Sequence, residues 1–88
     1  MIAFPIIYVV FIKDIFTSNL MTIPEIDNKL NKEIFDLPYE EIIVDFSGVS
    51  MMNQDFASHY LLNRSKSEKI IHEVNVPPSF QDRFNDSP

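Results

Sequence analysis

The 88-residue chain contains no cysteine, no tryptophan and a single glycine. Without cysteine it has no disulfide scaffold, no thiol nucleophile and no cysteine-ligated zinc site. One glycine also excludes a glycine-rich phosphate-binding loop. Basic residues are few, since 7 Lys and Arg stand against 13 Asp and Glu and give a net charge of −6. This balance disfavours nonspecific binding to nucleic acid, because phosphate contacts need clustered basic side chains.

Long hydrophobic runs are also missing. The longest covers residues 2–12 and includes Pro5, whereas a membrane-spanning helix needs about 20 apolar residues. The run lacks the basic start and the small-residue cleavage site of a signal peptide. We therefore expect no membrane partner and a cytoplasmic location.

What the chain does contain is typical of one globular domain. Hydrophobic residues make up 45% and charged residues 23%, which argues against disorder. A chain of this length buries only roughly 60–65% of its unfolded surface. Either the core is efficient or a partner adds to it, so a homodimer is one alternative.

Strand-like and helix-like segments alternate along the chain. We predict a β-α-β-α-β-α order, which favours an α/β fold whose sheet is mostly parallel or mixed, with helices packed on it. The predicted elements are a first strand region at 5–16, a helix at 22–37, a strand at 41–46, a helix at 53–66, a strand at 69–76, a short helix at 79–84 and a mobile tail at 85–88.

Local signals support the middle of this assignment. The segment from Thr22 to Glu25 has the spacing of a capping box, with Pro24 tolerated in a first turn. The aliphatic triplet 42–44 predicts a central strand that is buried on both faces. Gly48 follows this strand at a position where a positive φ is useful. Asn53 is a candidate N-cap for the second helix.

The segment 42–62 resembles the signature of the STAS domain, which sulfate-transporter tails share with bacterial anti-sigma factor antagonists. The run Val44-Asp45-Phe46-Ser47-Gly48-Val49 matches the strand and turn of that signature. The opening of the following helix, Gln54-Asp55-Phe56-Ala57, is most similar to the STAS-like domains of unknown function. The resemblance covers roughly residues 22–75 and implies a small STAS-like domain.

In anti-sigma factor antagonists, an ATPase-type histidine-kinase-like partner phosphorylates a serine at the start of this helix and is released by that modification. The resemblance places Asn53 and Gln54 at the two positions before that serine and Asp55 at the serine itself. Asp55 cannot be phosphorylated as a serine is, and it carries a fixed negative charge. The resemblance therefore implies a protein partner of the histidine-kinase-like ATPase type, with constitutive binding or a different switch.

We predict a non-enzymatic protein-interaction module of signalling regulation, with no cofactor, no metal and no catalytic residue. Its partner surface is the loop after the central strand and the outward side of the second helix. The predicted contact residues are Ser47, Ser50, Met51, Met52, Asn53, Gln54, Asp55, Ser58, His59 and Leu62.

Several alternatives stay open at this point. One or both methionines could fill the end of the core instead of meeting a partner. Asp55 and His59 have the i,i+4 spacing of a surface pair, and together with Asp45 they could instead form a small hydrolase site. The resemblance implies that Asp45 is a structural position in the turn. A self-associating structural subunit is the third alternative, because an uncovered edge of an apolar first strand pairs readily.

Overall fold

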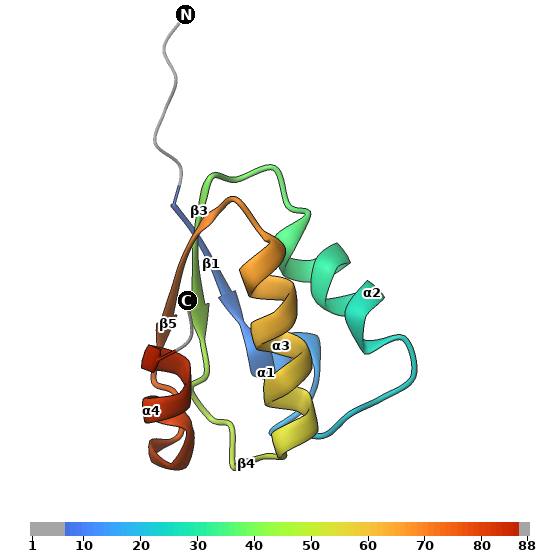
Figure 1. Cartoon of the computed structure of the whole chain (residues 1–88), viewed down its shortest axis with the longest axis vertical. Coiled ribbons are helices and arrows are strands. Elements are labelled where there is room, and N and C mark those ends of the chain that lie inside the picture. The colour runs from blue at the N-terminus through green and yellow to red at the C-terminus, as the bar shows by residue number, and fades with distance from the viewer. Residues whose placement is uncertain (1–6, 87–88) are drawn as a thin grey trace, which may run out of the picture.

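Within residues 7–86, which the computed structural model describes, three five-residue strands form one parallel sheet. β1 spans Ile7–Phe11, β3 spans Glu41–Asp45 and β5 spans Ile70–Val74. β3 lies between β1 and β5, and both pairings are parallel. Helices follow the strands and pack against the sheet (Figure 1). This arrangement confirms the predicted α/β fold class.

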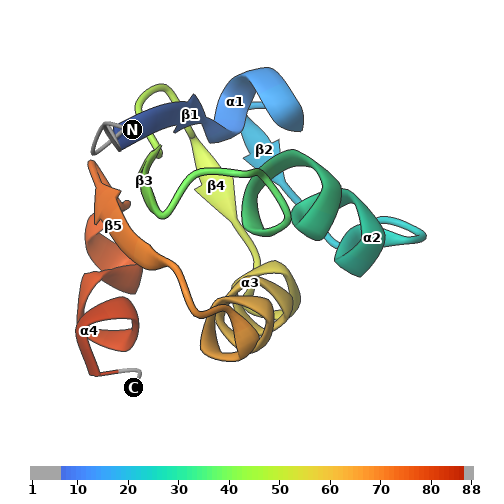
Figure 2. The ribbon, with the colours of Figure 1, turned by 90° about the horizontal axis from the view of Figure 1, so that it is seen from above.

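The helices cover one face of the sheet. Figure 2 shows α2 and α3 on the same side of the three strands. Ile42 and Val44 of β3 are fully buried. Phe46, Tyr60 and Phe84 pack together beside them with ring centroids 5.4–5.7 Å apart. The core therefore lies between the inner face of the sheet and the helices.

No helix within residues 7–86 covers the opposite face of the sheet, which is called the open face here. The side chain of Ile43 is only partly buried, so the prediction that the triplet is buried on both faces is wrong for this side. Residues at alternate positions of β1 and β5 share this face and are 37–56% exposed: Ile7, Val9, Phe11, Ile70 and Val74. A run of three aliphatic residues does not distinguish a strand covered twice from one whose second face is apolar but uncovered.

The first predicted strand region is divided between a strand and a helical turn. β1 ends at Phe11, and α1 spans Ile12–Ile15. The turn carries Ile12 into the core, where it is fully buried. The prediction of a strand over 5–16 is therefore wrong beyond Phe11, and its residues 5 and 6 lie outside the described part of the chain.

A second, two-stranded sheet was not predicted. β2 spans Asn19–Leu20 and β4 spans Met51–Met52, and the two are parallel. In register, Asn19 lies opposite Met51 and Leu20 opposite Met52. This pair joins the segment after α1 to the connection between β3 and α3.

The first long helix begins later than predicted. α2 spans Ile26–Leu30 and continues as a π-helical segment, η1, over Asn31–Phe35. Glu25 has a φ of 60°, and the amide of Ile26 donates to the carbonyl of Ile23. The predicted capping box over 22–25 is therefore wrong, because a residue before proline is pushed out of helical geometry and Ile23 precedes Pro24.

Two further helices, α3 and α4, complete the described part of the domain. α3 spans Gln54–Lys66, and α4 spans Pro78–Asp86. Phe80 and Phe84 are the buried residues of α4. The predicted short helix at 79–84 is longer in the structure and takes in the first half of the predicted tail; residues 87–88 lie outside the described part. Within residues 7–86, every helix is too short or too polar to cross a membrane.

Candidate functional site

The turn after β3 is held by one carboxylate. Asp45 Oδ1 accepts hydrogen bonds from the Ser47 amide at 2.8 Å, from the Ser47 hydroxyl at 2.6 Å and from Asn75 Nδ2 at 3.1 Å. The Ser47 hydroxyl is the largest cause that lowers the pKa of Asp45, and Asn75 adds to it. Gly48 follows with a φ of 78°, as its position predicted. Asp45 thus shapes the turn, and its Oδ1 accepts hydrogen bonds both from Ser47, which follows β3, and from Asn75, which follows β5.

The loop from this turn to α3 has a fixed backbone. The amides of Ser50 and Met51 donate to the carbonyl of Ser18 at 2.7 and 3.3 Å, and the amide of Asn53 donates to that of Leu20 at 2.9 Å. Ser50 is exposed. The two-residue pairing of β2 with β4 therefore anchors a loop that the sequence pattern left without structure.

The two methionines of the loop have different environments. Met51 is 57% exposed, whereas Met52 is 6% exposed and belongs to the core. For Met52, the alternative that it fills the end of the core is the one that fits. Met21 is 49% exposed, and its sulfur lies 3.8 Å from Asn53 Nδ2. Met21 and Met51 therefore flank the start of α3 with two exposed, flexible apolar side chains.

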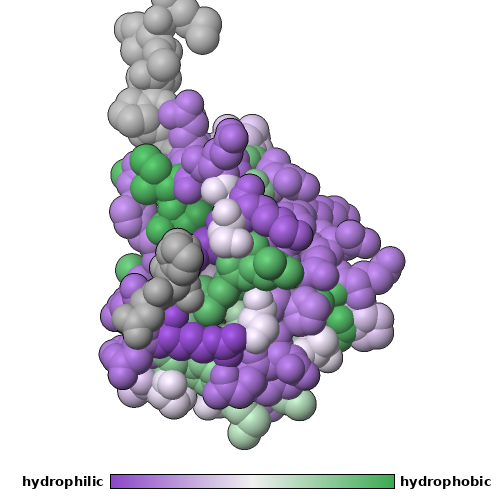
Figure 3. All heavy atoms as spheres, viewed as in Figure 1, coloured by the Kyte–Doolittle hydropathy of each residue, from purple (hydrophilic) through white to green (hydrophobic). Residues whose placement is uncertain are grey.

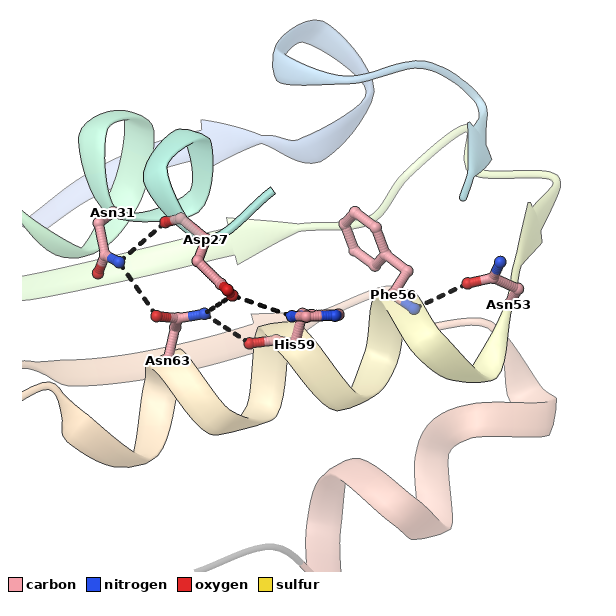
Figure 4. Close-up of polar contacts among 6 residues, drawn as sticks. All are labelled: Asp27, Asn31, Asn53, Phe56, His59 and Asn63. Carbon is pink, nitrogen blue, oxygen red and sulfur yellow. Dashed lines mark hydrogen bonds and ion pairs between the residues drawn. The ribbon is translucent and has the colours of Figure 1, made fainter. Parts of the chain in front are cut away.

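The N-terminus of α3 is capped as predicted. The Asn53 side chain accepts a hydrogen bond from the Phe56 amide at 2.7 Å (Figure 4). This bond satisfies one of the amides that have no partner within the helix. Asp55 lies exposed in the first turn, where its negative charge interacts favourably with the helix dipole.

α4 binds part of the predicted partner surface. The Arg83 guanidinium donates to the carbonyl and side chain of Gln54 and to the hydroxyl of Ser58. Gln54 and Ser58 therefore face α4 on one flank of α3, although both stay exposed. The sequence analysis missed Arg83, since nothing local to 79–84 indicates a contact with a helix 25 residues away.

A polar cluster joins α2 to α3 on the other flank (Figure 4). Asp27 Oδ1 accepts from Asn63 Nδ2 at 2.7 Å and lies 3.0 Å from His59 Nδ1. Asn31 Nδ2 donates to Asn63 Oδ1 at 3.0 Å. Asn63, which is 6% exposed, thereby has partners for both ends of its amide. The hydrogen bond from Asn63, followed by that with His59, lowers the pKa of Asp27.

His59 has a different partner from the one that the sequence pattern suggested. The sequence pattern paired His59 with Asp55 on the same helix, but the structure pairs it with Asp27 on α2. Of the three residues of the hydrolase alternative, His59 and Asp45 are thus engaged in different places, one between two helices and one in a turn. Among the described residues, no group of three or more His, Cys, Asp or Glu side chains could hold a metal ion.

Between its two flanks, α3 presents an outward stripe. Asp55 and Leu62 are exposed on it, and Leu62 is 51% exposed. In the view of Figure 3, hydrophobic residues form a patch over α3 that polar residues surround. Leu62 therefore lies on the side of α3 that faces away from the buried residues of the helix.

Comparison of the chain with known protein families, characterised proteins and solved structures finds no match to any of them.

The structure thus divides the ten predicted contact residues into groups. Ser50, Met51, Asp55 and Leu62 are exposed at the loop and along the outward stripe. Ser47 is exposed too, but its hydroxyl is bonded to Asp45 and Asn75. The other five have partners within the domain or lie in the core: Met52, Asn53, Gln54, Ser58 and His59. Met21, which comes from a distant segment, joins the first group.

Proposed function

We propose that the chain is a non-enzymatic protein-interaction module that binds a partner protein through the outward side of α3 and the loop before it. The proposed surface, called the α3 surface here, consists of Met21, Met51, Asp55 and Leu62. The observation that carries the proposal is the exposure of three large apolar side chains, 49–57% each, of which Met51 lies on the paired strand β4 and Leu62 on α3. A fixed apolar surface binds a partner without the entropic cost of ordering a loop.

The anchoring of this surface supports the proposal. Asn53 caps α3, the pairing of β2 with β4 fixes Met51, and Arg83 holds the flank of α3 at Gln54 and Ser58. Methionine adapts its shape to irregular partner surfaces. The α3 surface therefore combines a rigid frame with adaptable contact residues.

The charge of the surface favours a partner with basic residues near its apolar contact. Asp55 is exposed beside the methionines, and the whole chain has a net charge of −6. By the STAS resemblance, the partner is a histidine-kinase-like ATPase, and Asp55 stands where a phosphorylated serine would stand. We propose that this fixed charge is a permanent part of the contact and not a switch.

A recovery experiment tests the proposal. The immobilised wild-type chain and the variants Met51→Glu and Asp55→Lys are incubated with cell extract, and bound proteins are quantified by mass spectrometry. Met51 is the methionine of the loop to change, because Met52 is buried. The matched control is Ile70→Glu, because Ile70 is 56% exposed on the open face of the sheet, as Met51 is 57% exposed at the α3 surface.

A protein that the wild type and Ile70→Glu recover equally, and that both α3-surface variants lose at least tenfold, is the expected result. Equal recovery by all four chains would contradict the proposed surface. Circular dichroism of each variant confirms that the fold is retained.

A further inference from the structure

Among the described residues, β1 is an edge strand whose one paired neighbour is β3. It lies at one end of the three-stranded sheet, and its five residues, Ile7–Phe11, are all apolar or aromatic. Ile7, Tyr8, Val9 and Phe11 are 40–50% exposed. Edge strands usually carry a charge, a proline or a bulge that prevents pairing with another chain. The described strand has none of these, so its free edge is able to accept another strand.

A groove runs along this free edge. It has a volume of about 610 Å³ and is lined by four consecutive β1 residues, Tyr8–Phe11, with Asp14, Lys29 and Glu33 among the residues of the opposite wall. No residue of β3 lines it, which places the groove on the side of β1 away from the sheet. An added strand lies in such a position when it extends a sheet by backbone hydrogen bonds.

We propose that the occupant of this groove is β1 of a second copy of the chain, paired antiparallel about a two-fold axis at Val9. In this register Val9 faces Val9 of the second copy, and Ile7 faces Phe11 of the second copy. Every cross-strand pair on the open face is then apolar, and such pairs stabilise a sheet. The two sheets become one continuous sheet with β1 and its copy at the centre.

Charge selects this arrangement over a face-to-face dimer. Strand β1 contains no charged residue, so the pairing of the two strands itself brings no like charges together, and the groove wall carries a basic residue, Lys29, beside its acidic residues Asp14 and Glu33. The open face instead includes Glu41 and Asp45 of β3, which alternate with Ile43. Stacking two such faces would bring four carboxylates into one interface together with two His72 side chains, each 2.7 Å from a Glu41 carboxylate, and like-charge repulsion disfavours this excess of carboxylates between chains of net charge −6.

The α3 surface takes no part in this contact, so a failure of one proposal does not affect the other. Met51 and Leu62 belong to β4 and α3, whereas the dimer uses β1 and its groove. A dimer in solution is therefore expected whether or not the α3 surface binds a partner.

The register is tested by disulfide cross-linking of the full chain, because the protein has no cysteine of its own. The first variant is Val9→Cys, whose two thiols meet across the axis. Residues directly opposite on antiparallel strands are about 4.5–5.5 Å apart at Cα, which a disulfide can span. The second is Ile7→Cys, whose copies are four residues apart along the strand, or about 14 Å. The matched control is Leu62→Cys, whose exposure of 51% is close to that of Ile7 at 50%.

Mild oxidation is expected to convert Val9→Cys to a covalent dimer at least tenfold faster than Ile7→Cys or Leu62→Cys. The double variant Ile7→Cys/Phe11→Cys restores cross-linking. Light scattering of the cysteine-free wild type across a concentration series gives a dimer that dissociates on dilution. A wild type that is monomeric at all concentrations overturns the proposal. The same result is expected if another segment of the same chain fills the groove. Equal cross-linking of Val9→Cys and Ile7→Cys overturns the antiparallel register.

Discussion

Glu73 on β5 accepts a hydrogen bond from the hydroxyl of Tyr60 on α3, at 2.8 Å. The other oxygen of the same carboxylate accepts from Arg64 Nη1 at 2.7 Å, and the Arg64 and Glu73 side chains are only 12% and 11% exposed. Arg64 Nη2 also lies 3.4 Å from the carbonyl of Phe84. A single buried carboxylate therefore links α3 to the sheet, and its arginine extends the link to α4. Such a charge is tolerated in the core because both oxygens have partners.

Replacing Tyr60 with phenylalanine tests the first half of this link. The ring keeps its packing against Phe84, with centroids 5.4 Å apart, but Glu73 loses one donor. We expect Tyr60→Phe to lower the free energy of unfolding by about 1.5–3 kcal/mol at neutral pH, the usual range for a hydrogen bond to a charged group. Urea unfolding measures the change, and Tyr8→Phe, on the 40% exposed Tyr8, is the control.

The effect of Tyr60→Phe should depend on pH in one direction. Burial, and then the charge of Glu73, raise the pKa of Tyr60 well above its ordinary value of 10.0. A raised pKa in the folded state contributes stability that is present below pH 10 and is lost as the pH rises through the folded value. The wild type should therefore lose stability above pH 10 more steeply than Tyr60→Phe. A constant difference between the two chains up to pH 11 would contradict this assignment.

The second prediction concerns the attachment of α4. Arg83→Ala removes the donors to Gln54 and Ser58, while Phe80 and Phe84 still bury the apolar side of the helix. We expect Arg83→Ala to lower the free energy of unfolding by about 1 kcal/mol. Hydrogen exchange of the amides in 78–86 should become faster than in the wild type, and exchange of the amides in β3 should change less. The neighbouring exposed residue provides the control, Asp82→Ala. Unchanged exchange in α4 would mean that the Arg83 contacts do not hold the helix, and that its aromatic residues and the Arg64 contact to the Phe84 carbonyl are sufficient.

How much of this fold the sequence could predict depends on the range of the signal. The cap at Asn53 and the helix to Lys66 were predictable because both signals lie within one segment. The pairing of β2 with β4 was not, since two-residue strands have no periodicity. The contacts made by Arg83 and Asp27 depend on which helices lie side by side, and this is set by packing over distances that local patterns do not describe.

The candidate site was predictable to the same degree. Its position after β3 follows from the strand, turn and cap, which are all local. Which residues of α3 stay available could not be predicted, because His59 and Ser58 are engaged by residues about 25–32 positions away. Met21 joins the surface only through the β2–β4 pairing. Which side chains are exposed at the site therefore depends on tertiary packing, whereas the position of the site along the chain follows from local sequence signals.

The third prediction uses two neighbours on β3 to test whether the sheet is covered on one face. Ile42 is fully buried, whereas Ile43 points to the open face. Ile42→Ala should cost about 2–5 kcal/mol, the range for truncation in a packed core. Ile43→Ala should cost clearly less, because its site can fill with solvent. Equal losses in urea unfolding would mean that both faces of the sheet are covered in solution.

The last prediction concerns acid stability and the polar cluster between α2 and α3. Hydrogen bonds from Asn63 and then His59 hold the pKa of Asp27 below its ordinary value of 3.8. A lowered pKa in the folded state contributes stability that is present above about pH 4 and is lost as the pH falls through the folded value. The chain should therefore lose this contribution on acidification, and Asp27→Asn should lack it at every pH.

Site-specific titration separates the two donors that act on Asp27. Carboxyl-carbon NMR should show the pKa of Asp27 rising more in Asn63→Ala than in His59→Ala, because Asn63 makes the larger contribution. Leu62→Ala, on the exposed side of the same helix, should leave the pKa of Asp27 unchanged. Asp45 serves as an internal reference, because its hydrogen-bond partners lie on other segments. If Asp27 titrated at or above 3.8 in the wild type, the helices would not be joined at this cluster in solution. The order of the two alanine variants also matters. A larger effect of His59→Ala would mean that charge, and not the buried amide, sets the ionisation of this carboxylate.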